Sequence, residues 1–449
     1  MAEFIQHSKA YKTRRFLNWF PLGLTYALLY MGRYNLTVSK NALGDLMTKA
    51  EFGEIFGIGA VVYAFSFLVN GPLVDRIGGK KGILIGAAGS AVMNLLMGGY
   101  LYYILGTPNP ADQPLLGVFI VMYAINMYFQ SYGAVSIVKV NANWFHVNER
   151  GTFSGIFGIM ISTGIFLAFD VSGMILASPL VEGMGFNGGN AIWWVFFSPA
   201  VLLSIMFVIE TFLLKDQPGQ AGHEDFDTGD ASSGEDMNAR IPTLVLLKRI
   251  LTNPIILIIA GIEFCTGILR NGVMHWFPIY AKEQVAAGLD GGWQFMLNHW
   301  GLLLMIAGII GGNVAGIVSD KLFQSRRGPS AGFLYGILGV STLIMIFALA
   351  NGWILGAIVF IMSVAVIGTH GLLSGTATMD FGGRKGAATT VGIIDGFVYL
   401  GTGVQSISLG FITSKDWSYW PIFLFPFSVI GFLLLLKIWN AKPKGAGGH

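Results

Sequence analysis

Long apolar segments dominate this sequence and restrict what the chain can fold into more than any other feature. Hydrophobic residues make up 54% of the 449 residues and charged residues only 11%, against about 25% charged in a typical soluble protein. A helix that crosses a bilayer needs about 20 mainly apolar residues, because the backbone finds no solvent partner there. We therefore predict an all-α membrane protein with twelve transmembrane helices. The predicted spans are residues 17–38, 53–74, 82–105, 114–138, 152–178, 191–214, 254–276, 297–320, 330–350, 352–376, 387–411 and 418–440.

Lysine and arginine are distributed unevenly between the two sides of these predicted spans. Twenty of the 27 fall on the side that holds both termini, and four fall on the other side: Lys40, Lys49, Lys282 and Lys415. Because cytoplasmic loops carry the excess of positive charge, this pattern predicts that both termini are cytoplasmic.

Several functional classes are not indicated by the sequence. A net charge of +3 is too small to suggest nucleic-acid binding. The chain has no glycine-rich phosphate loop followed by lysine and serine, which argues against an ATP-driven pump. It also has no HExxH motif, paired-cysteine zinc spacing or nucleophile elbow. We therefore expect no enzymatic activity, no cofactor and no metal site.

The chain divides into two similar halves. A polar segment at residues 216–245, rich in Gly, Ser, Asp and Glu, has the composition of a flexible linker and separates residues 1–215 from residues 246–449, with six predicted spans on each side. Span two ends in Gly71–Lys81, and span eight ends in a similar segment, Gly316–Lys321. Matching segments at equivalent positions indicate a duplicated six-helix unit.

These two segments are the predicted conformational switch. Charges there can pair with neighbouring helix ends in one conformation and separate in another, or they can simply anchor helix ends at the membrane interface. The residues that we assign to this switch are Gly71, Asp75, Arg76, Asp320 and Lys321.

Two arginines lie inside predicted spans. Arg33 is in span one and Arg270 in span seven, the first helices of the two halves. An arginine at the centre of a membrane helix costs about 2.5–3.5 kcal/mol on translocon scales, so such residues are functional candidates. Their equivalent positions predict that both face one central cavity. Two guanidinium groups there would match a phosphate dianion through paired N–H donors.

The Gly71–Lys81 segment resembles the signature loop of the major facilitator superfamily. Arg33 and Arg270, together with Tyr128–Gly133 and Asn143–Phe145, resemble the organophosphate:phosphate antiporters of that superfamily. The resemblance extends to most of the chain through short matches, which also include 149–153, Trp276, Pro278, Tyr280, Ser319–Lys321, Arg327–Gly328 and 392–401.

This resemblance implies that two pseudo-symmetric six-helix halves exchange a sugar phosphate or glycerol phosphate for inorganic phosphate by alternating access. It further implies that Arg33 and Arg270 grip the phosphate and that Tyr26, Tyr30 and Tyr399 line the cavity. A multi-pass protein of the bacterial inner membrane, acting as a monomer, is the corresponding expectation.

The sequence departs from the glycerol-phosphate branch of that family at several positions. Phe67 stands where that branch has a lysine in span two, and Ile161 aligns with its histidine in span five. Ala134–Ser136 replaces its tryptophan and proline in span four. The site is therefore expected to have fewer auxiliary positive groups.

Five other polar residues in the spans allow more than one role. Lys139 could add a positive charge to the cavity or reach the cytoplasmic interface. His370 could bind substrate, carry a proton or bond between helices. Asp170, Glu263 and Asp395 could be proton carriers or ion-pair partners of the arginines.

Two alternatives to phosphate exchange therefore stay open at this stage. One is a proton-coupled symporter of another organic anion, such as a sugar acid, that uses these acidic residues or His370. The other is a transporter-like sensor of phosphate esters.

Overall fold

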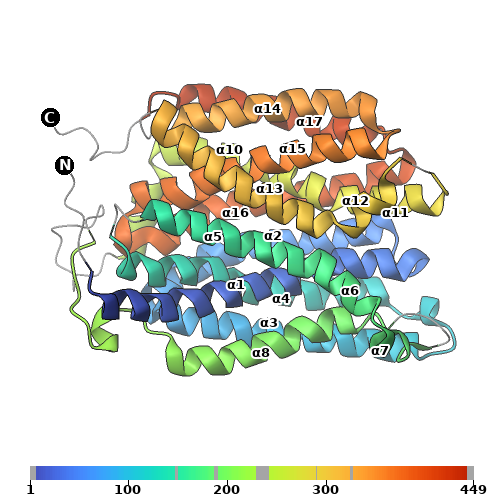
Figure 1. Cartoon of the computed structure of the whole chain (residues 1–449), viewed down its shortest axis with the longest axis horizontal. Helices are drawn as coiled ribbons and strands as arrows, with labels where there is room; N and C mark the ends of the chain where they lie inside the picture. Colours follow the sequence, from blue (N-terminus) through green and yellow to red (C-terminus); the bar gives the residue numbers. More distant parts are fainter. Residues whose placement is uncertain are drawn as a thin grey trace.

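The computed structural model describes residues 7–146, 150–186, 191–228, 242–289, 291–323 and 327–441. Within these ranges the chain is helical and contains no β-strand. The long helices run roughly parallel to one another, and the start of α1 and the end of α17 lie at the same end of the bundle (Figure 1). We call the end where α1 begins and α2 ends the inner end, following the predicted orientation, and the opposite end the outer end.

Residues before the polar segment form one group of helices. The group consists of α1 (Lys9–Leu43), α2 (Lys49–Ile77), α3 (Gly79–Leu105), α4 (Leu115–Trp144), α5 (Arg150–Phe166), the π-helical turn η4 (Leu167–Val171), α6 (Ser172–Leu176), α7 (Pro179–Glu182) and α8 (Trp194–Leu213). These helices, blue to green in Figure 1, lie together on one side of the bundle.

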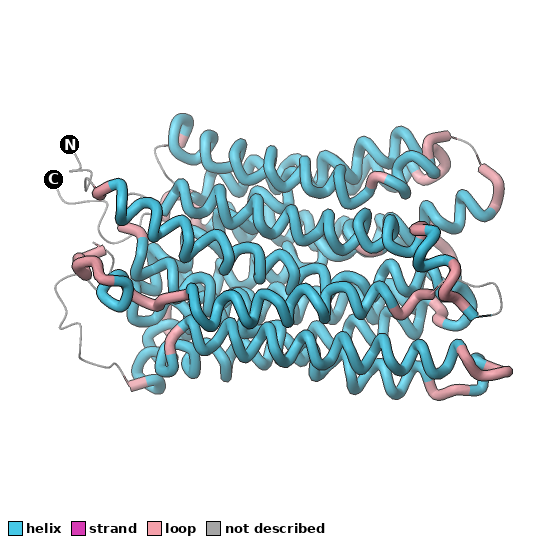
Figure 2. The backbone as a smooth tube through the Cα atoms, turned by 60° about the horizontal axis from the view of Figure 1, so that its bottom comes forward, coloured by secondary structure: helices cyan, strands magenta, loops and turns pink. Residues whose placement is uncertain are grey.

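Residues after the polar segment form the second group, yellow to red in Figure 1. It consists of α9 (Thr243–Leu251), α10 (Pro254–Met274), α11 (Trp276–Ala286), α12 (Trp293–Asn298), α13 (Trp300–Ile317), the π-helical turn η7 (Val318–Leu322), α14 (Arg327–Ala348), α15 (Gly352–His370), the π-helical turn η8 (Gly371–Ala377), α16 (Thr378–Lys415) and α17 (Tyr419–Lys437). The tube in Figure 2 shows the same bundle as nearly continuous helix, with loops confined to its two ends.

Ten helical stretches in the described ranges are long and apolar enough to cross a membrane. The remaining two predicted spans correspond to α1, with 35 residues, and α16, with 38 residues. Both are long enough to cross, and both carry buried polar side chains, including Arg33 in α1 and Asp395 in α16. The twelve-helix prediction is consistent with this architecture.

The two halves pack most extensively where α2 meets α16. The helices run antiparallel, and their glycines allow the backbones to touch at several levels of the bundle. A methyl group at Gly71 would lie 2.9 Å from the Ala388 carbonyl oxygen, and one at Gly392 would lie 2.8 Å from the Phe67 carbonyl oxygen. Near the outer end, a methyl group at Gly53 would lie 2.5 Å from the Ser406 carbonyl oxygen. Such close approach is what small residues permit between membrane helices.

The other junction between the halves, α5 with α13, is close at its outer part. A methyl group at Gly308 of α13 would lie 2.0 Å from the Ser162 hydroxyl of α5. Gly158 of α5 and Gly312 of α13 lie one turn closer to the inner end. A methyl group at either glycine would meet no described atom within 4 Å. Among the described residues, the close contact of α5 with α13 is therefore found at its outer part.

Packing inside the second half gives a stability prediction. A methyl group at Gly267 of α10 would lie 1.9 Å from the Val398 carbonyl oxygen of α16, whereas one at Gly312 meets no described atom within 4 Å. We expect Gly267→Ala to destabilise the folded protein by about 1–3 kcal/mol, because the helices must separate. The melting temperature of the purified protein in detergent should fall for Gly267→Ala and not for the control, Gly312→Ala. Equal melting temperatures for the two variants would contradict this packing.

Candidate substrate site between the two halves

Arg33 lies in the middle of α1 with its side chain fully buried. Its Nη1 donates a hydrogen bond to the Tyr399 hydroxyl oxygen at 2.6 Å, and its Nη2 donates to Oε1 of Gln130 at 3.5 Å. Tyr399 belongs to α16 of the second half and Gln130 to α4 of the first. Arg33 therefore contacts both halves from a position that water does not reach in this structure.

Arg270 reaches the same tyrosine from α10. Its Nη2 lies 3.4 Å from the Tyr399 hydroxyl oxygen, and its side chain is 5% exposed. The structure thus brings together the two arginines that the sequence placed in equivalent helices of the two halves. One hydroxyl group joins them.

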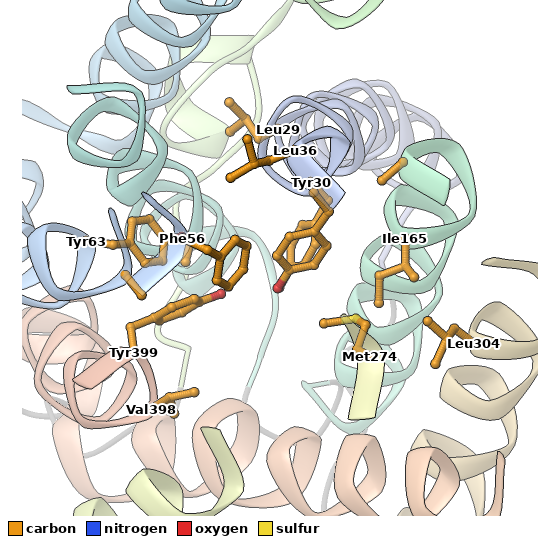
Figure 3. Close-up of a cluster of buried hydrophobic side chains, with 14 of the residues drawn as sticks. Leu29, Tyr30, Leu36, Phe56, Tyr63, Ile165, Met274, Leu304, Val398 and Tyr399 are labelled. Carbon is orange, nitrogen blue, oxygen red and sulfur yellow. The ribbon is translucent and has the colours of Figure 1, made fainter. Parts of the chain in front are cut away.

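Aromatic rings surround the two guanidinium groups. The guanidinium carbon of Arg33 lies 4.4 Å from the ring centre of Tyr30 and 4.7 Å from that of Tyr63. Rings at these distances attract a cation through their negatively polarised faces. Tyr26 packs edge-on against Tyr30, with ring centres 5.2 Å apart. Figure 3 shows Tyr30, Tyr63 and Tyr399 converging from three separate helices.

The sequence prediction of this lining was incomplete. It named Tyr26, Tyr30 and Tyr399 but not Tyr34, Tyr63 or Gln130. Tyr34 lies four residues after Tyr30 in α1, so helical periodicity could have identified it. Tyr63 and Gln130 carry no comparable sequence signal, because many polar and aromatic residues in membrane helices only pack.

The charge of the two arginines is not balanced by a direct acidic partner. Among the described residues, no carboxylate lies within ion-pair distance of either guanidinium group. The Nε atoms of both arginines are buried and have no hydrogen-bond partner there. Buried cations and unsatisfied donors are costly. The arrangement can therefore accept an anion that supplies the missing acceptors and charge.

Two acidic residues of the second half lie near this site with partners of their own. Glu263 of α10 is fully buried, and its Oε2 lies 2.7 Å from Nδ1 of His370 at the end of α15. Asp395 of α16 is buried and accepts a hydrogen bond from the Ser374 hydroxyl. The sequence allowed His370 to bind substrate, carry a proton or bond between helices. The structure shows a hydrogen bond between α15 and α10, from His370 to Glu263.

Asp170 occupies a different place, at the outer end. Its carboxylate accepts hydrogen bonds from the backbone N–H groups of Gly301, at 2.7 Å, and Leu302, at 2.8 Å. These donors belong to the first turn of α13, where the backbone lacks intrahelical acceptors and the helix dipole favours a negative charge. Asp170 thus caps a helix of the opposite half and holds the outer ends of the two halves together.

Three further contacts join the halves at the outer end. The Thr37 hydroxyl lies 2.7 Å from Nδ1 of His275, and Lys49 forms a 3.0 Å ion pair with Glu283. The amide nitrogen of Asn41 lies 3.5 Å from the Pro278 carbonyl oxygen. The sequence analysis did not identify these contacts, which depend on how the halves are placed relative to each other.

Lys139 lies with the switch segment at the inner end, not with the residues that contact the arginines. Its Nζ forms a 2.8 Å ion pair with Asp75 near the end of α2. Asp75 in turn accepts hydrogen bonds from the backbone N–H, at 3.3 Å, and the hydroxyl group, at 3.0 Å, of Thr389 in α16. Lys139 thus pairs with Asp75 toward the inner end, and its role in transport stays a prediction.

The other switch residues are placed unevenly. Gly71 packs against the α16 backbone, as described above, and Arg76 is exposed in the last turn of α2. The backbone of Asp320 and Lys321 forms part of η7, but their side chains lie outside the described residues.

Comparison with known families settles the fold family of the chain. The family model described as the Major Facilitator Superfamily matches residues 22–406. The chain belongs to the major facilitator superfamily. This match takes in α2–α15 and the parts of α1 and α16 that carry Arg33 and Tyr399.

Two of the similar proteins are named as transporters of organic phosphates. The chain is 26% identical to a glycerol-3-phosphate transporter of Bacillus subtilis, over 97% of this chain and 94% of that protein. It is 24% identical to a probable hexose phosphate transport protein of Chlamydia trachomatis, over 98% and 94% of the two chains. It is also 24% identical to the membrane sensor protein UhpC of Salmonella typhimurium, over 93% and 90%. The resemblance to organophosphate transporters predicted from the sequence is thereby confirmed.

The positions where the sequence departs from the glycerol-phosphate branch can now be placed. Phe67 is fully buried in α2, with its ring centre 6.1 Å from that of Tyr399 and 4.5 Å from that of Tyr63. Ile161 of α5 is partly buried against the core. An aromatic ring therefore occupies the wall of the arginine site where a lysine was expected from the resemblance.

The cap that Asp170 provides gives a prediction about the outer end. Asp170→Ala removes both hydrogen bonds to the first turn of α13, and we expect the outer ends of the halves to separate more often. Ser39 is fully buried in α1 near this end and can be replaced by cysteine in a Cys265→Ser background. A water-soluble maleimide should then label Ser39→Cys several-fold faster when Asp170→Ala is also present.

The control for this experiment is Asp45→Asn, because Asp45 lies outside the helix contacts between the halves. Labelling of the Ser39→Cys protein should not change with this substitution. Equal labelling rates with and without Asp170→Ala would show that the cap does not hold the outer end closed.

Proposed function

We propose that this protein exchanges a small organic phosphate, of the sugar phosphate or glycerol phosphate type, for inorganic phosphate by alternating access. The observation that carries the proposal is the pair Arg33 and Arg270. They come from equivalent helices of the two halves, meet at the Tyr399 hydroxyl and have no carboxylate partner in the described residues. Location in a bacterial inner membrane with cytoplasmic termini, and action as a monomer, belong to the same proposal.

The chemistry of the pair suits a phosphoryl group. Each guanidinium group offers several N–H donors in a plane, and these match two oxygens of a phosphate at once. The Nε donors, which have no hydrogen-bond partner among the described residues, are available for this purpose. Tyr399 can donate its hydroxyl proton to a third oxygen, since its hydroxyl already lies between the two arginines.

Exchange follows from the electrostatics of the empty site. Two buried positive charges without direct partners oppose the closure and reopening of the halves around them, because each closed intermediate must hold the charges away from water. An anion between Arg33 and Arg270 neutralises them, and either phosphate species can do so. Reorientation is therefore fast only when the site is loaded, which makes transport an obligatory exchange.

The contacts between the halves support alternating access. At the outer end the Asp170 cap and the Lys49–Glu283 pair connect the halves, and the close contact of α5 with α13 is found, among the described residues, at its outer part. Opening the site to the outside requires these outer contacts to break. At the inner end, the Asp75–Thr389 hydrogen bond connects the halves in the same way, and it belongs to the proposed conformational switch.

Exchange can be measured with the purified protein in liposomes that contain labelled inorganic phosphate. We expect release of the label when glycerol 3-phosphate or glucose 6-phosphate is added outside. Arg33→Lys and Arg270→Lys keep one positive charge but lose the paired donors, and each should lower the rate about 10–100-fold, since a hydrogen bond to a charged group contributes about 1.5–3 kcal/mol. Wild-type rates in both folded variants would remove this site from the mechanism.

The same experiment separates the alternatives. Release that requires a proton gradient, or uptake of a sugar acid without phosphate release, would favour a proton-coupled symporter of another anion. The similarity to a membrane sensor protein favours a second candidate, a sensor that binds phosphate esters without moving them. Such a sensor would show a thermal shift with phosphate esters but no release of labelled phosphate.

A further inference from the structure

Three titratable groups of the second half form a cluster that the phosphoryl site does not use. Glu263 comes from α10, His370 from the end of α15 and Asp395 from α16. Glu263 is fully buried and bonded to His370 at 2.7 Å, while its second oxygen has no hydrogen-bond partner among the described residues. Asp395 lies within electrostatic range of both. Groups of this kind inside a membrane protein mark ion or proton pathways.

The cluster lies directly beside the arginine site, on its inner side. Glu263 precedes Arg270 by seven residues on α10, which is two helical turns or about 10 Å. Asp395 precedes Tyr399 by four residues on α16, about one turn. Because residues at these spacings share a helix face, the carboxylates and the arginines face the same region between the helices. Asp395 is within electrostatic range of Arg270.

Among the described side chains, Arg270 is the permanent cation whose charge acts on Glu263. The described ionisable groups on the elements packed against Glu263 include Cys265 of α10, His370 of α15, Asp395, Tyr399 and Lys415 of α16, Tyr280, Lys282 and Glu283 of α11, Lys248 of α9, Tyr419 and Lys437 of α17, and Tyr335 of α14, whose hydroxyl donates to the Ile262 carbonyl oxygen. An anion that binds Arg270 therefore competes directly with Glu263 and Asp395 for the same positive charge.

We propose that the Glu263–His370 pair takes up one proton when a phosphoryl anion binds to Arg33 and Arg270, so that anion and proton binding are linked. The proposal rests on the proposed phosphoryl site. The proton comes from water, and the net charge of the pair changes from −1 to 0. This change removes the repulsion between the buried carboxylate and the incoming anion.

The geometry of the pair indicates where the proton enters. The His370 side chain is 12% exposed, whereas the Glu263 side chain is fully buried. With Glu263 ionised, Nδ1–H of His370 donates to Oε2 of Glu263, because a carboxylate only accepts, and Nε2 is then the acceptor on the more exposed residue. A proton that binds Nε2 produces an imidazolium beside the carboxylate, and no further co-reactant is required. Glu263 is then a positioning residue for the protonation of His370.

Because protonation of the Glu263–His370 pair is linked to anion binding, the proposal predicts a measurable uptake of protons when the anion binds. We expect wild-type protein to take up close to one proton more than Glu263→Gln or His370→Gln when inorganic phosphate or glycerol 3-phosphate binds. Calorimetric titration in two buffers of different ionisation enthalpy gives this number. A phosphate ester itself titrates near pH 6, but this contribution is the same for every variant and cancels in the difference.

Glu210→Gln is the matched control, because Glu210 is a fully buried carboxylate of α8 in the other half. Its proton uptake should equal that of wild type. The affinity of wild type for phosphate should rise as the pH falls, by up to about tenfold per unit for one linked proton, and this dependence should be weaker in Glu263→Gln. Equal proton uptake in wild type, Glu263→Gln and His370→Gln would overturn the proposal while leaving the exchange function standing.

Infrared difference spectroscopy gives a second measurement. Spectra of the protein with and without inorganic phosphate should differ by a histidine protonation signal that is present in wild type and Glu210→Gln and absent from Glu263→Gln and His370→Gln. Absence of this signal from wild type with phosphate bound would overturn the proposal. Absence of binding to every probe would instead contradict the proposed phosphate site.

Discussion

Two buried arginines meet at the hydroxyl group of Tyr399, between the two halves of the bundle. Arg33 and Arg270 belong to different halves, and the tyrosine that joins them lies 2.6 Å from one and 3.4 Å from the other. Tyrosine rings solvate the charge only partly, because a cation–π contact contributes about 0.5–2 kcal/mol and cannot replace full hydration. Among the described residues, the two charges therefore have neither a carboxylate partner nor full hydration.

The described contacts between the halves are of two kinds. Glycine-mediated backbone packing of α2 against α16 occurs at several levels of the bundle and keeps the halves together. Apart from the Arg33–Tyr399 hydrogen bond, the polar contacts named above lie toward the ends of the bundle, as with Asp170 at the first turn of α13 and Asp75 at Thr389. Charged hydrogen bonds of this kind break singly at modest cost when a loaded site favours rearrangement. Two arrangements of similar free energy are what a transporter requires.

The spans and the central pair of arginines could be predicted from the sequence, because a bilayer imposes length, apolarity and the cost of a buried charge on every helix. The position of Lys139 could not be decided in that way, since it depends on the ion pair with Asp75 across α2 and α4. The same holds for Asp170, whose partners are backbone N–H groups of α13 and carry no sequence signal. Tyr63 and Gln130 were missed because only the packing of α2 and α4 against α1 brings them to Arg33. The division at residues 216–245 stays a prediction.

The central claim is that Arg33 and Arg270 hold the same phosphoryl group, and a double-mutant cycle on phosphate binding tests it most directly. The dissociation constant of inorganic phosphate would be measured for wild type, Arg33→Lys, Arg270→Lys and the double variant. If both arginines grip one phosphoryl group, the loss in the double variant should be smaller than the sum of the single losses, with a coupling of about 0.5–3 kcal/mol. Strictly additive losses, or a single variant that binds phosphate as wild type does, would contradict the account.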